Sequence, residues 1–534
     1  MITRSIGCCL CLASLLGGCS QSSLSGRREG GTTGPADGGD ARAVVRSDAG
    51  GNLALSGTQA GPGTGTAFDP RANGSDGVAL DPSGAIVLGP ASTSSSASLI
   101  WVANSDEGTI SKVDTRQLKE LARYRTGPAL PDPSRTTVSL DGDVVVANRH
   151  RVPSATKIAA DPSRCTGSGR GSSTSGTDLR DWGDDRCVLW HTPLPDGSTP
   201  RAAAFDAEEG PRGELSAHVW IGLYDHEKLV ELDATTGAKL GEIDTSPVKP
   251  YGMAVDGAHN LWVVSNGKTA GKLHIPTRRW TQIKDPPCSY GIAVDPQGRV
   301  WTSRDDCVAR YSPTTDTWDR ASVGSDNKGL AIDASGSVWI ASGDRVIQAG
   351  METMTRTKSV PLGASGVIGM AVDFDGMIWA ISQDDDAAIR IHPTTYATDQ
   401  VPVGRGPYTY SDMTGFQLRN AAGRLGSYRQ TFTGCTGEAR WERLSWTVAL
   451  TAATSLEVRA RTADDAAGLA TAPWVLIAKQ PTQGPPADLA LPLGASATKP
   501  LLQVELRLRS SKASETPILS RIEAQRRCPG AVVY

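Results

Sequence analysis

The stretch Tyr290-Gly-Ile-Ala-Val-Asp-Pro-Gln-Gly-Arg-Val-Trp301 decides the fold, because its pattern recurs along the chain. Three further clear copies end on tryptophans at a spacing of 38 to 40 residues, namely Trp262, Trp339 and Trp379. Looser copies place three more residues in the same slot: Trp101, Val145 and Trp220. The chain therefore contains seven repeat units of supersecondary size.

Each unit contains the signals of a small antiparallel sheet. The alternation Gly-φ-Ala-φ-Asp, where φ is an apolar residue, predicts a short strand, and Asp-x-x-Gly predicts a tight turn. The run around each tryptophan predicts a second strand, and segments such as Leu229–Asp233 and Lys239–Ile243 predict a third and a fourth. Four strands in about 40 residues form a propeller blade, which buries its faces only against neighbouring blades. Residues 71–415 are therefore expected to form a seven-bladed β-propeller.

The repeat core Gly-φ-Ala-φ-Asp-x-x-Gly-x-φ-Trp resembles the virginiamycin B lyase-like and NHL/YVTN propeller families, over residues 75 to 410. The resemblance implies the fold, and for the lyases it implies His, Glu and a magnesium ion at one face. Lyase repeats read Trp-Phe-Thr-Glu, whereas this chain has Trp262-Val-Val-Ser and Trp301-Thr-Ser-Arg. Because the acidic position is lost, catalytic and metal-binding residues stay unknown from the sequence.

After residue 415 the repeat stops and spaced alternating strands follow, as in Ser455–Arg461 and Leu501–Leu508. Such alternation is typical of sheets with one wet face. Residues 416–534 are expected to form a β-sandwich of jelly-roll or immunoglobulin-like type, which makes the whole chain all-β.

The N-terminus has the features of an export signal. Arg4 precedes an apolar run from Ile6 to Leu16, which is shorter than the ~20 residues that span a bilayer. The segment resembles a bacterial lipoprotein signal, which implies cleavage after residue 18 and lipidation of Cys19. Ser20 then favours the outer membrane within the cell envelope. Residues 19–70 are rich in Gly, Ser and Thr and are expected to form a flexible tether.

Six cysteines remain after the signal and the lipidated residue, and an even number in an exported chain favours disulfides. Six cysteines allow 15 pairings, so the pairing needs structural data. Order along the chain suggests Cys165–Cys187, Cys288–Cys307 and Cys435–Cys528. The first pair lies in extra sequence, an insertion expected at about 153–200.

In a propeller, the loops that enter the first strand and leave the second share one face around the central channel. The candidate binding residues of this rim are aromatic, acidic and basic. They are Tyr224, Asp225, His226, Tyr251, Tyr290, Arg304, Asp305, Asp306, Lys328, Asp384, Asp385 and Asp386. The three consecutive aspartates are the best candidates for a divalent cation, Mg²⁺ or Ca²⁺.

Two functions are consistent with these features. The first is an exported, lipid-anchored binding protein for a protein or glycan ligand, and the second is a divergent metal-dependent lyase that acts at the rim through His226. The net charge of −3 gives no basic excess for nucleic acid. Because no catalytic pair can be assembled from the sequence, the binding protein is favoured and enzyme activity remains open.

Overall fold

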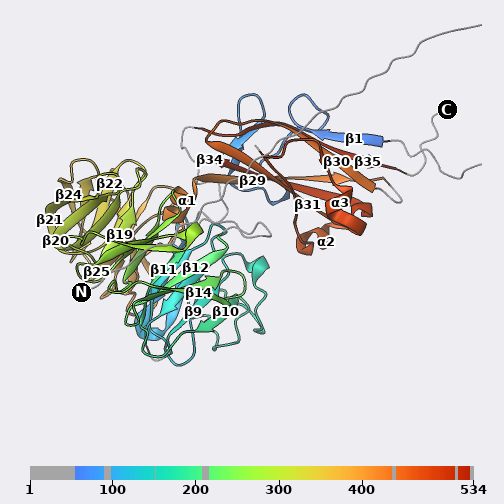
Figure 1. Ribbon diagram of the computed structural model, residues 1–534. Helices are drawn as coiled ribbons and strands as arrows, with labels where there is room; N and C mark the ends of the chain where they lie inside the picture. The colour runs from blue at the N-terminus through green and yellow to red at the C-terminus, as the bar shows by residue number, and fades with distance from the viewer. Residues whose placement is uncertain are drawn as a thin grey trace, which may run out of the picture. The chain divides into compact units, whose positions relative to one another are not determined.

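The computed structural model describes residues 55–89, 98–150, 152–206, 216–435, 440–480, 482–510 and 515–528. The expected signal peptide, Cys19 and the first part of the expected tether lie outside these ranges. Strands dominate the described chain, and its three α-helices are short (Figure 1): α1 (Phe416–Ala422), α2 (Ala466–Thr471) and α3 (Ala490–Leu493). None of the helices in these ranges is long and apolar enough to cross a membrane.

The repeat region folds into consecutive antiparallel sheets whose strands follow sequence order. The first sheet has three strands, β4 (Leu99–Asn104), β5 (Thr109–Asp114) and β6 (Lys119–Arg125). The second has β7 (Pro133–Val138), β8 (Val144–Asn148), β9 (Ser154–Ile158) and β10 (Val188–Pro193). The third has β11 (Pro200–Phe205), β12 (His218–Leu223), β13 (Lys228–Asp233) and β14 (Lys239–Asp244). The fourth has β15 (Gly252–Val255), β16 (Asn260–Val264), β17 (Ala270–His274) and β18 (Arg279–Ile283).

The next sheet has six strands and contains two repeats. It comprises β19 (Gly291–Val294), β20 (Val300–Ser312), β21 (Thr317–Ile332), β22 (Ser337–Ser342), β23 (Arg345–Gly350) and β24 (Arg356–Pro361). Strand β20 pairs with β19 through its first residues and with β21 through its last. One long strand therefore takes the place of two successive strands of the repeat. The last sheet of the region has β25 (Val367–Val372), β26 (Ile378–Ser382), β27 (Ala387–Ile391) and β28 (Thr398–Pro402).

The first strands of these sheets contact one another in a closed series. Contacts join β7 to β11, β11 to β15, β15 to β19, β19 to β21, and β21 to β25. Residues 407–413 then run beside β4, where the Trp101 amide donates to the Met413 carbonyl and the Tyr408 amide to the Ala103 carbonyl, both at 2.9 Å. The hydroxyl oxygens of Thr409 and Thr136 on β7 are 3.2 Å apart, which closes the series. The region is therefore a propeller-like, all-β structure.

The repeated Asp and Trp of each unit form one hydrogen-bonded pair. The Trp301 indole nitrogen donates to the Asp295 carboxylate at 2.9 Å, and the same bond recurs in the other clear copies: Trp262 to Asp256, Trp339 to Asp333, and Trp379 to Asp373. The second oxygen of Asp295 accepts backbone amides of its turn, in which Gly298 has a φ of +77°. The pattern persists because the buried indole needs an acceptor and the turn needs a residue that tolerates positive φ.

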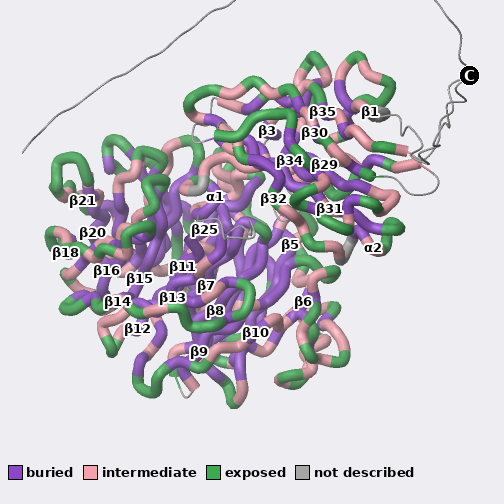
Figure 2. Tube along the Cα trace, turned by 45° about the vertical axis from the view of Figure 1, so that its right-hand side comes forward, coloured by how far each residue is buried: buried purple, intermediate pink, exposed green. Residues whose placement is uncertain are grey.

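Two further sheets are built mainly from C-terminal strands. One contains β1 (Leu55–Ala60), β2 (Val78–Leu80), β3 (Ile86–Leu88), β30 (Arg440–Ala449), β33 (Ala487–Asp488) and β35 (Ile518–Arg527). The other contains β29 (Arg424–Thr433), β34 (Leu501–Ser510), β31 (Thr454–Ala463) and β32 (Val475–Gln480). Side chains of both sheets, among them Trp441 and Tyr428, form one hydrophobic cluster. Figure 2 shows buried residues along these strands and along the sheets of the repeat region.

The expected ranges of the tether and the propeller are wrong between residues 55 and 88. Leu55–Ala60 forms β1 and pairs with β35, and Ile86 of β3 pairs with Leu519 of the same strand. Val78, Ile86 and Leu88 are buried in the cluster of the C-terminal sheets. Sequence patterns miss these strands because they are short and their partner lies more than 400 residues away, as in the Gln59–Glu523 hydrogen bond.

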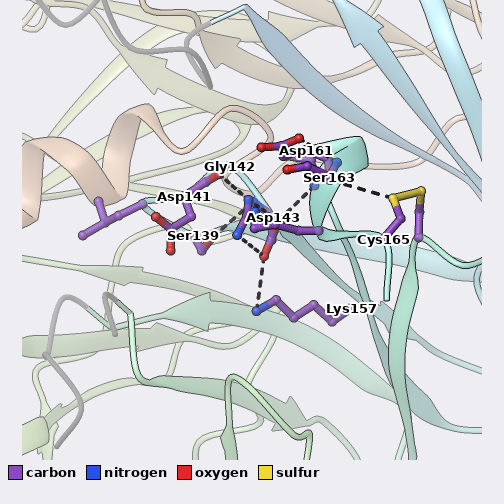
Figure 3. A network of polar contacts seen from close by, with 12 residues as sticks. Ser139, Asp141, Gly142, Asp143, Lys157, Asp161, Ser163 and Cys165 are labelled. Carbon is purple, nitrogen blue, oxygen red and sulfur yellow. Dashed lines mark hydrogen bonds and ion pairs between the residues drawn. A yellow bond between two sulfur atoms is a disulfide. The ribbon is translucent and has the colours of Figure 1, made fainter. Parts of the chain in front are cut away.

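All three expected disulfides are formed: Cys165–Cys187, Cys288–Cys307 and Cys435–Cys528. The insertion is narrower than the expected range of 153–200, because β9 and β10 are regular blade strands on either side of residues 159–187. The excursion is fixed to its sheet at Asp143 (Figure 3), which binds Arg164 at 2.8 Å and Lys157 at 3.4 Å beside the disulfide of Cys165.

Candidate functional site

One slot of the repeat directs its side chains to the inner ends of neighbouring sheets. It is the residue before the repeated glycine, occupied by Tyr251, Tyr290 and Lys328. In the third sheet, Ala204 pairs with Trp220 as Ala254 pairs with Trp262, which places Arg201 in the same slot as Tyr251. The slot therefore supplies aromatic and basic groups from consecutive strands.

The glycine after this slot allows the inner strands to approach closely. A Cβ on Gly329 would lie 2.7 Å from the Ile368 carbonyl oxygen, and one on Gly291 would lie 2.6 Å from the Lys328 carbonyl oxygen. Such distances exclude any larger side chain at these two positions without backbone movement. By register, β7 has Arg135 at this position, because Thr137 pairs with Val145 of the tryptophan slot. A long cationic side chain thus replaces the smallest residue in one blade.

Five tyrosines gather around this arginine, and we call them the tyrosine cluster: Tyr224, Tyr251, Tyr290, Tyr408 and Tyr410. The rings of Tyr290 and Tyr410 are stacked, with centroids 4.7 Å apart. Tyr251 lies 5.2 Å from Tyr290 and 5.8 Å from Tyr224, measured between centroids. Tyr251 and Tyr410 are buried, whereas the other three are half-buried, so part of the cluster is accessible to solvent.

Three phenol groups share a hydrogen-bond network. The Tyr408 hydroxyl oxygen lies 2.8 Å from that of Tyr290 and 3.3 Å from that of Tyr251. Arg201 donates through Nη1 to the Tyr251 hydroxyl at 3.4 Å. These groups come from the closing segment and from three consecutive sheets of the chain, so the network depends on correct assembly of the repeats.

Arg135 is the most buried charge of the cluster, with 0 % of its surface exposed. Its guanidinium carbon lies 3.2 Å from the Tyr410 ring centroid and 4.9 Å from that of Tyr251, a cation–π arrangement. Nε and Nη1 donate to backbone carbonyls of Tyr251 and Ser134 at 3.4 and 3.2 Å. Neither Arg135 Nη2 nor the buried Tyr410 hydroxyl has a hydrogen-bond partner among the described residues.

The cations around the tyrosine cluster divide into two groups. Arg149, Lys249 and Lys328 each pair with a carboxylate, those of Asp132, Asp225 and Asp326 respectively. Within the described ranges, Arg135 and Arg201 form no ion pair. A local excess of positive charge therefore exists in a protein whose net charge is −3.

This charge acts on the phenols. Burial by itself raises the pKa of Tyr408, but the positive charge of Arg135 and the hydrogen bonds from Tyr251 and Tyr290 lower it to about 8. Burial raises the pKa of Tyr290 and of Tyr251 above the ordinary value. Burial also lowers the pKa of Arg135 to about 10, which leaves it charged at neutral pH. Tyr408 is thus the phenol of the network that ionises first.

The remaining rim candidates lie in separate interactions. Arg304 donates to Asn266 at 2.9 Å and lies 3.4 Å from Asp305, and Asp306 accepts from Ser322 at 2.9 Å. Asp225 and His226 are exposed, and no hydrogen bond or ion pair joins His226 to another residue of the described chain. Of the predicted rim residues, the structure brings Tyr224, Tyr251, Tyr290 and Lys328 together, and it places the others in separate contacts.

The three consecutive aspartates do not converge. Asp385 accepts from the Ser365 amide and the Ser382 hydroxyl, both at 2.7 Å, and Asp386 accepts from the Gly406 amide at 2.7 Å. Asp384 faces the αL residue Gly366. Across the described ranges, no group of three or more His, Cys, Asp or Glu side chains is arranged to hold a metal ion.

Sequence reasoning missed Arg135, Arg201, Tyr408 and Tyr410 as members of the cluster. The pair Tyr408 and Tyr410 lies in the closing segment, where alternation indicates that both side chains point to one side of a strand. The two inner-strand arginines could have been found by aligning the looser repeat copies on the tryptophan slot. Their copies lack the Gly-φ-Ala-φ-Asp pattern, so their register is clear only from strand pairing.

Two surface hollows lie outside the cluster itself. One of about 270 Å³ lies between the turn at Leu130 and the insertion residue Trp182. The other, of about 730 Å³, is lined by Asp326, Ser342, Asp344 and Arg345 among others. Asp326 pairs with Lys328, whose Nζ lies 5.9 Å from the Tyr290 ring centroid, so the larger hollow adjoins the tyrosine cluster.

Comparison with protein-family models and with curated proteins finds no match. Among solved structures, a streptogramin B lyase is similar at 14 % identity, over 61 % of this chain and 95 % of that one, with a TM-score of 0.41. Virginiamycin B lyase from Staphylococcus aureus is similar at 13 % identity, over 54 % and 90 % of the two chains, with a TM-score of 0.40. A functionally unknown protein from Desulfotomaculum acetoxidans DSM 771 has 11 % identity, over 59 % and 99 %, with a TM-score of 0.43. The site is therefore interpreted from its own residues.

Proposed function

We propose that this chain is an exported, lipid-anchored binding protein that recognises a protein or glycan ligand at the tyrosine cluster of a seven-bladed propeller. The cluster carries the proposal. Half-buried aromatic rings beside cations without carboxylate partners are typical of recognition surfaces, where rings supply contact area and polar groups supply orientation. A purely structural core would pair or exclude the buried charge of Arg135.

The contact series of inner strands supports the blade count. It runs through β7, β11, β15, β19, β21, β25 and the closing segment beside β4, which gives seven inner strands. The shared hydrophobic cluster of the two C-terminal sheets supports a β-sandwich as a second domain. Each of these folds presents loops and sheet faces to partners, so the chain has two platforms for binding.

The N-terminal pattern and the cysteines support the location. Three disulfides suit an oxidising compartment outside the cytoplasm. Lipidation at Cys19 would hold the folded part at the cell envelope, in the outer membrane according to Ser20. Labelling with radioactive palmitate tests this point: the full chain should take up label, and Cys19→Ala should not. Label in the Cys19→Ala chain would contradict the proposed anchor.

Binding is tested by a thermal-protection screen of glycans and envelope extracts on the purified full chain. We expect at least one ligand to raise the unfolding temperature, and Tyr290→Ala to abolish that rise. Tyr396→Ala is the matched control, because Tyr396 is a half-buried tyrosine outside the cluster. Its ring centroid lies 6.3 Å from that of Trp339, and its hydroxyl donates to Gln348. A ligand that protects the Tyr290→Ala chain as well as the parent would refute the assignment of the site.

A further inference from the structure

The charge balance of the tyrosine cluster is incomplete in a way that specifies its ligand. Arg135 has no carboxylate partner within the described ranges, is fully buried and retains one Nη2 group without an acceptor. Arg201, in the slot before the repeated-glycine position of the next sheet, has the Tyr251 hydroxyl as its one polar side-chain partner among the described residues. Burying a cation without a counter-ion is strongly unfavourable. The tyrosine cluster therefore lacks a negative group that would compensate these positive charges.

We propose that the tyrosine cluster seats an oxyanion of the ligand, a carboxylate, sulfate or phosphate group, against Arg201 and the hydroxyls of Tyr290 and Tyr408. This inference rests on the proposed function and specifies the chemistry of its ligand. The guanidinium of Arg201 offers a planar set of N–H donors, which suits the paired oxygens of such groups. Arg135 adds positive charge behind the Tyr251 and Tyr410 rings without touching the anion.

Other ligand classes fit these residues less well. A cation would be repelled by Arg135 and Arg201. In the part of the chain that the structure describes, the nearby carboxylates of Asp132, Asp225 and Asp326 already pair with basic groups. A neutral aromatic ligand would stack on the rings and leave both charges uncompensated. An oxyanion accepts from Arg201 and the two hydroxyls, and its charge offsets those of Arg201 and Arg135.

Tyr408 provides an internal reporter for this binding. Arg135 from β7 and Arg149 after β8 lie over its ring, and its hydroxyl contacts those of Tyr251 and Tyr290. Arg135 and Arg201 from β11 are the charges that lower its pKa. Arg135, Arg201 and the two hydroxyls stabilise the Tyr408 phenolate. A bound anion repels that phenolate, so binding raises the pKa of Tyr408 from about 8. By linkage, affinity for the anion falls as the pH rises through that value.

The experiment measures binding of sodium sulfate, sodium phosphate and sodium glucuronate to the full chain by calorimetry, each as a separate arm. Sodium chloride at the same ionic strength gives the baseline. We expect one or more oxyanions to bind, and Arg201→Gln to weaken that binding about tenfold or more. Arg201→Lys should retain part of it. Arg304→Gln is the matched control, because Arg304 is a rim arginine engaged with Asn266 and Asp305 outside the cluster.

A second measurement follows tyrosinate absorbance against pH. The parent chain should show one tyrosine that ionises near pH 8, absent in Tyr408→Phe, and saturating oxyanion should move this ionisation upward. A merely structural Arg201 would not produce this ligand-dependent movement. Unaltered near-UV circular dichroism identifies the variants that fold, and Arg201→Lys serves if Arg201→Gln does not.

The outcomes separate this inference from the proposed function. Equal oxyanion binding by the parent and Arg201→Gln overturns the inference. Absence of oxyanion binding, together with a screened ligand whose protection depends on Tyr290, overturns the inference and leaves the binding site standing. Absence of both overturns both.

Discussion

Arg135 on β7 and Asp143 in the turn between β7 and β8 are both buried, yet their charges have different surroundings. Asp143 is 2 % exposed and accepts from Arg164 at 2.8 and 3.0 Å, from Lys157 at 3.4 Å and from the Ala160 amide at 2.9 Å. Arg135 is 0 % exposed and has ring faces and backbone carbonyls but no carboxylate. One site is complete within the chain and the other is not. This difference separates a structural charge from one that is kept for a ligand.

The largest expected effect is at the complete site. Asp143→Ala leaves Lys157 and Arg164 without their shared acceptor, and breaking a buried ion pair costs about 3 to 5 kcal/mol of unfolding free energy. Urea denaturation measures it. Asp141→Ala is the control, because Asp141 is an exposed aspartate in the same turn, and its variant should lie within about 0.5 kcal/mol of the parent. A loss of unfolding free energy below about 1 kcal/mol for Asp143→Ala would contradict the structural role given to Asp143, and with it the contrast with Arg135.

A substitution of Arg135 is expected to change the free energy of unfolding in the opposite direction. Replacing a buried, unpaired cation by an apolar side chain of similar length removes a desolvation penalty, although it also removes the cation–π contacts. Arg135→Met in chloride buffer should therefore unfold at the same urea concentration as the parent or at a higher one, a gain of about 0 to 3 kcal/mol. A loss of more than about 2 kcal/mol would mean that Arg135 is as structural as Asp143.

A smaller effect is expected from the phenol that compensates Arg135. The pKa of Tyr408 is about 8 in the folded chain and 10.0 in its ordinary state, so the folded state releases its proton first. The resulting stabilisation is complete above pH 10.0, and it is lost as the pH falls through about 8. The parent should therefore gain about 1 to 2 kcal/mol relative to Tyr408→Phe between these values. Unfolding curves across this window measure the difference, and parallel curves would contradict it.

The smallest effect is expected from divalent cations. The carboxylates of Asp385 and Asp386 bind separate backbone amides, so no chelating set awaits Ca²⁺ or Mg²⁺ at that loop. Either ion should change the unfolding temperature no more than sodium chloride of equal ionic strength does. The control is the triple substitution of Asp384, Asp385 and Asp386 by Asn, which removes the carboxylates of this loop. If calcium raised the unfolding temperature of the parent but not of this variant, the result would support the cation site that the sequence suggested.

The sequence predicted the features that each repeat encodes locally. The Asp–Trp pair, as in Asp295 and Trp301, and the turn glycine Gly298 both act within one unit, so their spacing alone indicates the strands. The disulfides follow chain order because each closes between neighbouring segments or between the ends of the C-terminal region. These parts need no knowledge of distant partners.

The parts that failed depend on register and on distant pairing. Arg135 and Arg201 enter the site only because β7 and β11 pair with their neighbours in one register, and their copies of the repeat lack its glycine. Strands β1, β2 and β3 join a sheet whose other members follow residue 439. The aspartates at 384–386 suggested a cation by adjacency, but backbone amides satisfy them instead.

The central claim is that the uncompensated charge of the tyrosine cluster belongs to an anionic ligand. Its most direct test is the sulfate dependence of the unfolding free energy in three chains: the parent, Arg201→Gln and Asp143→Ala. Sulfate stabilises proteins generally by exclusion from their surface, so the difference between chains is what counts. Asp143→Ala, though less stable, should gain as much unfolding free energy from sulfate as the parent does. Arg201→Gln should lose the saturable part of that gain, which comes from binding at the cluster. An identical sulfate response in all three chains would contradict it.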